Sequence, residues 1–229
     1  MVRKNGGRTM AASNGAVSGS QTLARGLSAL KLIGEASTSL TVSELGAALG
    51  IHRSMAYRLV RTLEEHGFVT RTASGALELG VQLASLARNV ARDLQAAAAP
   101  ALAAVANELG MTAFLVGYDG EAAVTLSTAE PDGPDATVAQ RPGSRHAIDR
   151  GAPGRVIRSQ LDPVSHPPKA FELSHDEIIA GLSSVAVPLR THDRRPASLA
   201  VVYITRERDL DAIARCLTAA AARVERALG

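Results

Sequence analysis

The 229-residue sequence predicts an α+β protein, in which an N-terminal winged helix-turn-helix domain is followed by a linker helix and a mixed domain with an antiparallel sheet. Two observations carry this prediction. Up to Gly80 the apolar residues follow three helices and then a short hairpin, whereas after Gly110 their period changes from helical to strand-like. The composition, 46% hydrophobic and 21% charged, excludes a wholly disordered chain and is compatible with two hydrophobic cores.

Three helices are predicted before the hairpin. Leucines at helical spacing define the first helix, over 22–36. Thr41 is followed three residues later by Glu44, which is the capping-box pattern at the start of a short second helix. The third helix runs over 52–66 and ends at Gly67.

One face of the third helix is apolar. Strand candidates at 68–72 and 76–79, joined by a turn that contains glycine, follow it and would form the wing. The apolar face, which would pack on the first two helices, consists of Ala56, Leu59, Val60 and Leu63. The polar residues of this helix therefore point away from the core.

The rest of the chain predicts a linker helix over 81–95 and then a domain over 96–229. Its strongest signal is Asp119-Gly120, which lies between strand-like segments and is typical of a hairpin turn. Further strands are expected at 184–189 and 198–204, short helices at 154–161 and 174–180, a loop before 154, and a long final helix from Leu210.

The formal net charge of +3 is divided unevenly along the chain. Residues 1–80 carry nine basic and five acidic side chains, a balance of +4, which leaves 16 basic and 17 acidic side chains, a balance of −1, in the remainder. This asymmetry favours a nucleic-acid-binding module joined to a neutral ligand-binding or oligomerisation module.

The composition also bears on location. A single cysteine, Cys216, cannot form an intramolecular disulfide and fits a reduced cytoplasm. No apolar run approaches the roughly 20 residues that a membrane span needs, so no membrane segment is expected. Residues 1–20, rich in Gly, Ser and Asn, are expected to form a disordered tail, and 21–80 the DNA-binding domain.

The exposed face of the third helix and the wing form a candidate interface with double-stranded DNA. Hydroxyl groups at the start of the second helix can hold a phosphate, arginines can reach guanine edges or phosphates, and Tyr57 and Met55 can touch thymine methyl groups. The candidate DNA contacts are Thr41, Ser43, Arg53, Ser54, Met55, Tyr57, Arg58, Arg61 and Arg71.

The stretch TVSELGAALGIHRSMAYRLVRTLEEHGFV, within 23–80, resembles the winged DNA-binding domain of the IclR family of bacterial transcriptional regulators. In that family a linker helix and an effector domain similar to GAF folds follow. NELGMTAFLVGYDGEAAVTL looks like the first helix and hairpin of the effector domain, and GLSSVAVPL and SLAVVYIT resemble its late strands. The resemblance covers nearly all of 22–229 and implies a GAF-like domain that is shortened between Leu161 and Gly181.

The sequence departs from the family where the resemblance places the effector pocket. Asp149 stands at the position of a family histidine, Arg155 at that of a lysine, and Val202 and Ile204 where serines are common. The implied pocket residues are Phe114, Val116, His146, Asp149, Gly151, Ala152, Leu182 and Ser184. Because this lining is mostly apolar, an apolar or aromatic effector is favoured over a small polar acid. An ordinary core without an inducer site stays open.

The expected function is that of a transcriptional regulator which binds an inverted-repeat operator as a homodimer or homotetramer and is modulated by a small-molecule effector. Two alternatives stay open: a regulator whose effector domain only oligomerises, and a small-molecule sensor or enzyme whose winged helix binds protein.

Catalytic motifs are weak in this sequence. Residues 181–185 lack the second glycine of a nucleophile elbow, and neither a phosphate loop nor a dinucleotide fingerprint is present. His146 and Asp149, even together with His175 and Asp176, do not follow a known metal-ligand spacing. The sequence therefore predicts no enzyme activity, metal or cofactor.

Overall fold

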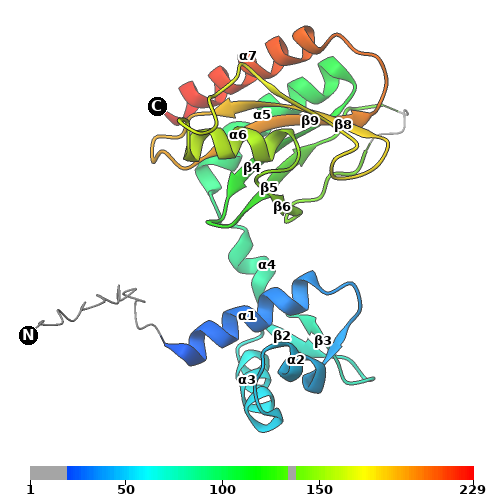
Figure 1. The fold of residues 1–229 in the computed structure, drawn as a ribbon, viewed down its shortest axis with the longest axis vertical. Coiled ribbons are helices and arrows are strands. Elements are labelled where there is room, and N and C mark those ends of the chain that lie inside the picture. The colour runs from blue at the N-terminus through cyan, green and yellow to red at the C-terminus, as the bar shows by residue number, and fades with distance from the viewer. Residues whose placement is uncertain (1–19, 134–137) are drawn as a thin grey trace, which may run out of the picture. The chain divides into compact units, whose positions relative to one another are not determined.

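The computed structural model describes residues 20–133 and 138–229, so the expected tail at 1–20 lies outside the described residues except for Ser20. The chain divides into two compact units, one up to Val90 and the other from Ala91 to Gly229 (Figure 1). Each unit has its own hydrophobic core.

The N-terminal unit consists of three helices and a small antiparallel sheet (Figure 1). The helices are α1 (Gln21–Glu35), α2 (Val42–Ala48) and α3 (Arg53–Glu65). The sheet has the order β1-β3-β2 and consists of β1 (Leu40–Thr41), β2 (Val69–Arg71) and β3 (Ala76–Leu79). This arrangement is the predicted winged helix-turn-helix. Strand β1 was not expected, because two residues are too short to show an alternating pattern.

Local hydrogen bonds fix where these helices begin. The Glu44 N–H donates to Thr41 Oγ1 at 3.3 Å, and the Thr41 N–H donates to Glu44 Oε2 at 2.7 Å, which confirms the predicted capping box. His52 caps α3, where its Nδ1 accepts from the Ser54 N–H at 3.3 Å. After α3 the chain turns at Gly67, whose φ of +71° favours glycine.

The expected single linker helix over 81–95 is wrong. The structure has α4 (Gln82–Ala87) and a separate α5 (Arg92–Leu109). Between them Ala91 has a φ of +46°, a left-handed conformation that cannot continue a right-handed helix. Apolar residues continue at helical spacing across this break, so the break cannot be predicted from the sequence pattern.

The C-terminal unit is built on a six-stranded sheet of order β6-β5-β4-β9-β8-β7, in which every described pairing is antiparallel. Its strands are β4 (Thr112–Tyr118), β5 (Ala122–Ala129), β6 (Arg145–Ala147), β7 (Glu172–His175), β8 (Leu182–Leu189) and β9 (Ala197–Ile204). The hairpin turn predicted at Asp119-Gly120 is confirmed, since it joins β4 to β5 and Gly120 has a φ of +99°.

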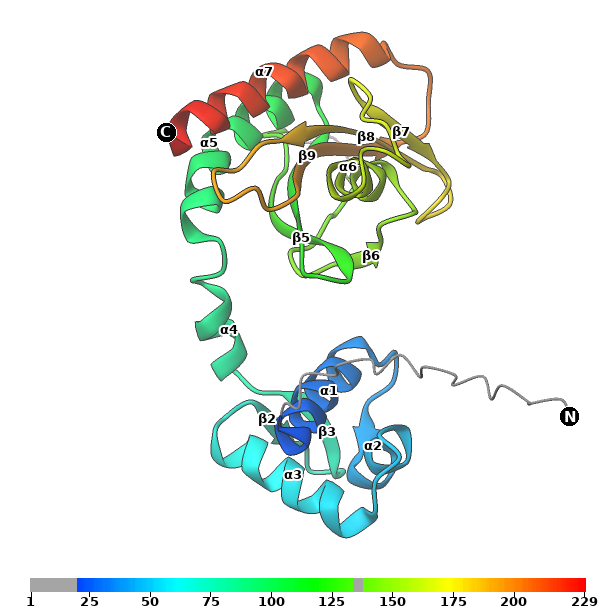
Figure 2. The same cartoon turned by 60° about the vertical axis from the view of Figure 1, so that its left-hand side comes forward.

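Helices cover both faces of this sheet (Figure 2). Helix α5 and the final helix α7 (Leu210–Leu228) pack on one face, where Val185 and Val187 of β8 point. Helix α6 (Ala152–Leu161) packs on the other face, against Ala186 of β8 and its neighbours. This alternation follows from the two-residue period of a strand, and it places the α6 face on the side of the cavity described below.

The helix predicted at 174–180 is also wrong. Ser174 pairs with Ser184 in the edge strand β7, and the chain then turns back over 176–181 into β8. Asp176 has a φ of +53°, and its Oδ1 accepts from the Gly181 N–H at 2.7 Å, so the segment is a closed turn. No helix within the described parts of the chain is long and apolar enough to cross a membrane.

Candidate DNA interface and ligand pocket

The structure exposes all nine candidate DNA contacts, which lie at the start of α2, along α3 and in β2. The two hydroxyl groups at the start of α2 differ. The Thr41 hydroxyl donates to Glu44 Oε2 at 2.8 Å, whereas Ser43 has no hydrogen bond from its side chain to another described residue. A phosphate at this helix end would therefore meet Ser43 more readily than Thr41.

Tyr57 joins the recognition helix α3 to the wing. Arg53 Nη2 donates to the Tyr57 hydroxyl at 3.2 Å, and this hydrogen bond lowers the pKa of Tyr57. The guanidinium carbons of Arg53 and Arg71 lie 5.4 and 5.9 Å from the centre of the Tyr57 ring, within cation–π range. Because Arg71 belongs to β2, the cluster holds helix and wing in one arrangement.

The arginines of this surface differ in their pairing. Arg61 Nε lies 2.9 Å from Glu65 Oε1, and Arg71 Nη2 lies 3.2 Å from Glu64 Oε2. Exposed ion pairs of this kind are weak, so a phosphate can replace the carboxylate. Arg58 has no ion pair with any residue that the structure describes, so its charge is available without breaking a contact.

A groove of about 780 Å³ lies beside this surface, between α1, α3 and α4. Leu23, Leu27 and Leu86 line it and are 62%, 54% and 51% exposed. Met55 and Arg58 also line it, and Met55 Sδ accepts from Arg25 Nη1 at 3.3 Å. Helical spacing alone did not reveal the groove, because it cannot show which leucines face solvent.

A cavity of about 60 Å³ lies in the C-terminal unit, on the α6 face of the sheet. It is lined mainly by strands β4, β6, β7, β8 and β9, by the start of α6, and by the turn 176–181. Its lining residues are Phe114, Gln140, His146, Gly151, Pro153, Ser174, Glu177, Ile178, Ile179, Leu182, Ser183, Ser184 and Val202.

Five of the eight expected pocket residues line this cavity: Phe114, His146, Gly151, Leu182 and Ser184. The other three do not. Val116 and Ala152 are fully buried in the core beside α6, and Asp149 is exposed in the turn before that helix. Glu177, Ile178 and Ile179 were missed, because a helix was expected where the structure has the turn.

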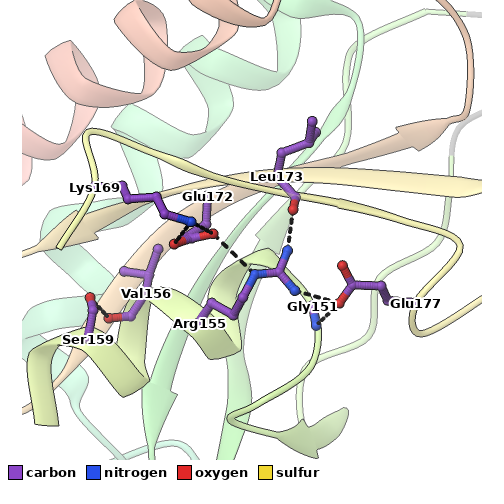
Figure 3. A network of polar contacts seen from close by, with 8 residues as sticks. All are labelled: Gly151, Arg155, Val156, Ser159, Lys169, Glu172, Leu173 and Glu177. Carbon is purple, nitrogen blue, oxygen red and sulfur yellow. Dashed lines mark hydrogen bonds and ion pairs between the residues drawn. The ribbon is translucent and has the colours of Figure 1, made fainter. Parts of the chain in front are cut away.

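Arg155 ties the turn and strand β7 to helix α6 (Figure 3). Its Nη1 donates to Glu177 Oε2 at 2.6 Å, its Nε to Glu172 Oε2 at 3.1 Å, and its Nη2 to the Leu173 carbonyl. Glu177 Oε2 also accepts from the Gly151 N–H at 2.9 Å. The Arg155 side chain is 18% exposed, so its charge is compensated inside the protein.

Charge and burial set the protonation states around the cavity. The hydrogen bond from Arg155 and that from the Gly151 N–H lower the pKa of Glu177, which outweighs the effect of burial. Burial alone would lower the pKa of Arg155, but the bonds to Glu177 and Glu172 raise it. Burial lowers the pKa of His146 below 6.5, so its imidazole is mostly neutral at pH 7.

Two polar atoms at the cavity have no hydrogen-bond partner among the described residues. They are His146 Nε2 and Ser184 Oγ, and both are buried. Polar atoms in such surroundings are usually paired, so the cavity offers unused hydrogen-bonding capacity.

A winged helix is a DNA-binding fold, and here it is followed by a separate unit that contains a small cavity. This combination is typical of DNA-binding regulators that have a second domain for a small ligand. Residues 22–73 match the IclR helix-turn-helix domain. The chain is 27% identical over 218 residues to the glycerol operon regulatory protein of Streptomyces griseus, which covers 81% of this chain and 84% of that protein.

Solved structures give the same result. An IclR transcriptional regulator from Alicyclobacillus acidocaldarius aligns with a TM-score of 0.78 at 25% identity, over 91% of this chain and 98% of that one. An IclR homologue from Microbacterium hydrocarbonoxydans, complexed with 4-hydroxybenzoate, shares the fold with a TM-score of 0.72 at 20% identity, over 90% and 98%. The N-terminal unit thus matches an IclR helix-turn-helix domain, and the chain as a whole is similar in fold to an IclR transcriptional regulator, which confirms the resemblance and the fold class seen in the sequence.

The Arg155 network predicts a pH-dependent stability. Because Glu177 has a lowered pKa in the folded state, it stabilises the fold above its ordinary pKa of 4.5, and this contribution is lost as the pH falls through the folded value. Glu177→Gln should lower the free energy of unfolding at pH 7 by about 1 kcal/mol, and by less below pH 4.5. Urea unfolding at several pH values measures both effects.

Glu130→Gln is the matched control, since Glu130 is exposed and has no hydrogen bond to a described residue. Equal stability of Glu177→Gln and the unmodified protein at pH 7 would contradict this description of the network.

Proposed function

We propose that this regulator binds an inverted-repeat operator as a homodimer or homotetramer, and that a small molecule in the cavity of the C-terminal unit modulates the binding. In this proposal 21–80 read the DNA, and 96–229 bind the effector and assemble the subunits. The observation that carries the proposal is the exposed arginine surface of α3 and the wing, in which Arg58 has no ion pair within the described part of the chain.

The proposed contacts fall into two kinds. Ser43 at the start of α2, Arg53 at the start of α3 and Arg71 in the wing are placed to bind phosphates, which would fix the position of the recognition helix on the DNA. Ser54, Arg58 and Arg61 lie on the solvent side of α3, opposite the buried Ala56 and Val60, and would face base edges.

The leucines on the α1 side of the groove support the dimer, and Met55 and Arg58 on its α3 side remain available to DNA. Apolar side chains as exposed as Leu23 and Leu27 mark a surface that a partner covers. We assign this partner to a second copy of the chain, because two winged helices related by a two-fold axis require an operator with the same symmetry.

We further propose an effector that is apolar or aromatic in its main part, since Phe114, Ile178, Leu182 and Val202 supply most of the wall. The complex of a similar protein with 4-hydroxybenzoate supports a small-molecule ligand for this regulator. The family is one of transcriptional regulators, so we propose regulation and not catalysis as the function, and the cytoplasm as the site of action because DNA is the target.

Arg58→Ala should weaken binding to the operator by about 10- to 100-fold and relax the preference for operator over random DNA, because a base contact is lost. Fluorescence anisotropy with a labelled fragment from upstream of the gene measures both affinities. Arg226→Ala, an exposed arginine of α7, is the control and should leave binding unchanged. Binding that is insensitive to salt and to Arg58→Ala would overturn the proposed interface.

Leu27→Asp should shift the protein towards smaller species, since it places a charge in the apolar groove. Sedimentation velocity measures the distribution of species. Val164→Asp, at an 89% exposed residue outside the groove, is the control. An unchanged distribution in Leu27→Asp would mean that the groove is not the dimer contact.

A further inference from the structure

Ser184 presents an unused hydroxyl group to the cavity. It is 8% exposed and lies on β8 beside Val202 of β9, and its Oγ has no hydrogen-bond partner among the residues described. A buried hydroxyl without a partner is costly, and a bound molecule that pairs with it would recover this cost. The site therefore favours a ligand that carries a hydrogen-bonding group.

His146 supplies a second group of the same kind. Its Nε2 is buried without a partner within the described part of the chain. Gly151 lies beside this nitrogen, since a Cβ atom added to Gly151 would be 3.4 Å from it. Because burial lowers the pKa of His146, its imidazole is mostly neutral at pH 7. A neutral imidazole does not form an ion pair with an anionic ligand. A neutral imidazole and a serine hydroxyl match an alcohol or phenol, which both donates and accepts.

The charges around the cavity disfavour an acid. Among the described residues the lining includes Glu177 but neither lysine nor arginine. The adjacent Arg155 is paired inside the protein, since its Nε, Nη1 and Nη2 donate to Glu172, Glu177 and the Leu173 carbonyl. The nearby Arg150 donates to the Glu177 carbonyl and does not line the cavity. A carboxylate ligand would therefore be buried near a second carboxylate without a lysine or arginine among the described lining residues to compensate it.

The cavity also limits the size and body of the ligand. Its volume of about 60 Å³ restricts the ligand to a small molecule. Phe114, Leu182 and Val202 provide an apolar wall. A small ring or short alkyl chain with one hydroxyl group satisfies both the wall and the unpaired polar atoms.

We propose that the effector is an uncharged small molecule with a hydroxyl group on an apolar body, such as a phenol or a short alcohol. The hydroxyl group binds at Ser184 and His146, and Glu177 excludes carboxylic acids. This inference rests on the proposed function only in treating the bound molecule as an effector. The chemistry of the cavity is tested separately from DNA binding.

Three ring compounds of similar shape separate the possibilities: phenol, toluene, which lacks the hydroxyl group, and benzoate, which replaces it with a charge. Isothermal titration calorimetry of the full chain at pH 7.5 should show binding of phenol, about five-fold weaker binding of toluene, and no binding of benzoate. Binding of benzoate that equals or exceeds that of phenol would overturn the inference.

Ser184→Ala should lower the affinity for phenol, because only the His146 contact is then left for the hydroxyl group, and should leave the affinity for toluene unchanged. Ser198→Ala is the matched control, because the Ser198 hydroxyl is also buried without a partner among the described residues but does not line the cavity. Glu177→Gln should allow benzoate to bind. Equal losses of phenol and toluene in Ser184→Ala would contradict a hydroxyl contact.

Operator binding by the same unliganded protein distinguishes the two proposals. If the protein binds its operator but none of the three compounds, the inference about the cavity fails and the regulator stands. If phenol binds as expected but the operator does not, the proposed function fails and the chemistry of the cavity stands.

Discussion

The pairing of one buried guanidinium organises the ligand side of the C-terminal unit. Arg155 projects from α6 with little exposure to solvent, so its charge requires partners inside the protein. Glu172 of β7 and Glu177 of the following turn meet this requirement, and in doing so they hold an edge strand and the cavity wall against the helix. The planar fork of an arginine makes three directed bonds here, which the compact ammonium group of a lysine cannot reproduce.

This pairing also determines the chemistry of the cavity. Arg155 is paired with carboxylates of the protein, and His146 is mostly uncharged at pH 7. The unpaired hydrogen-bonding groups that the cavity offers to a ligand are therefore neutral, and they lie beside an apolar wall. The N-terminal unit follows the opposite principle. The arginines of its DNA-binding surface are exposed to solvent, and Tyr57 contacts both Arg53 and Arg71. The ion pair of Arg71 with Glu64 is weak, so a phosphate can replace the carboxylate. The guanidinium beside the cavity is thus paired inside the protein, whereas the arginines of α3 and the wing are exposed to solvent.

Sequence patterns predicted the elements that local chemistry determines. The capping box at Thr41, the hairpin at Asp119-Gly120 and the long amphipathic helices follow from contacts within a few residues. The break at Ala91 depends on one left-handed residue that no local pattern marks. Strand β7 exists because it pairs with β8, a contact between distant segments, so the turn that lines the cavity was mistaken for a helix.

In the proposed function, a ligand in the C-terminal cavity changes the affinity for the operator. The most direct test is the operator dissociation constant of the full chain with and without saturating phenol, measured in the unmodified protein and in Ser184→Ala. Phenol should change this constant several-fold in the unmodified protein and much less in the variant at the same phenol concentration. An operator affinity that phenol leaves unchanged in the unmodified protein, although phenol binds to it, would show that the cavity does not control operator binding.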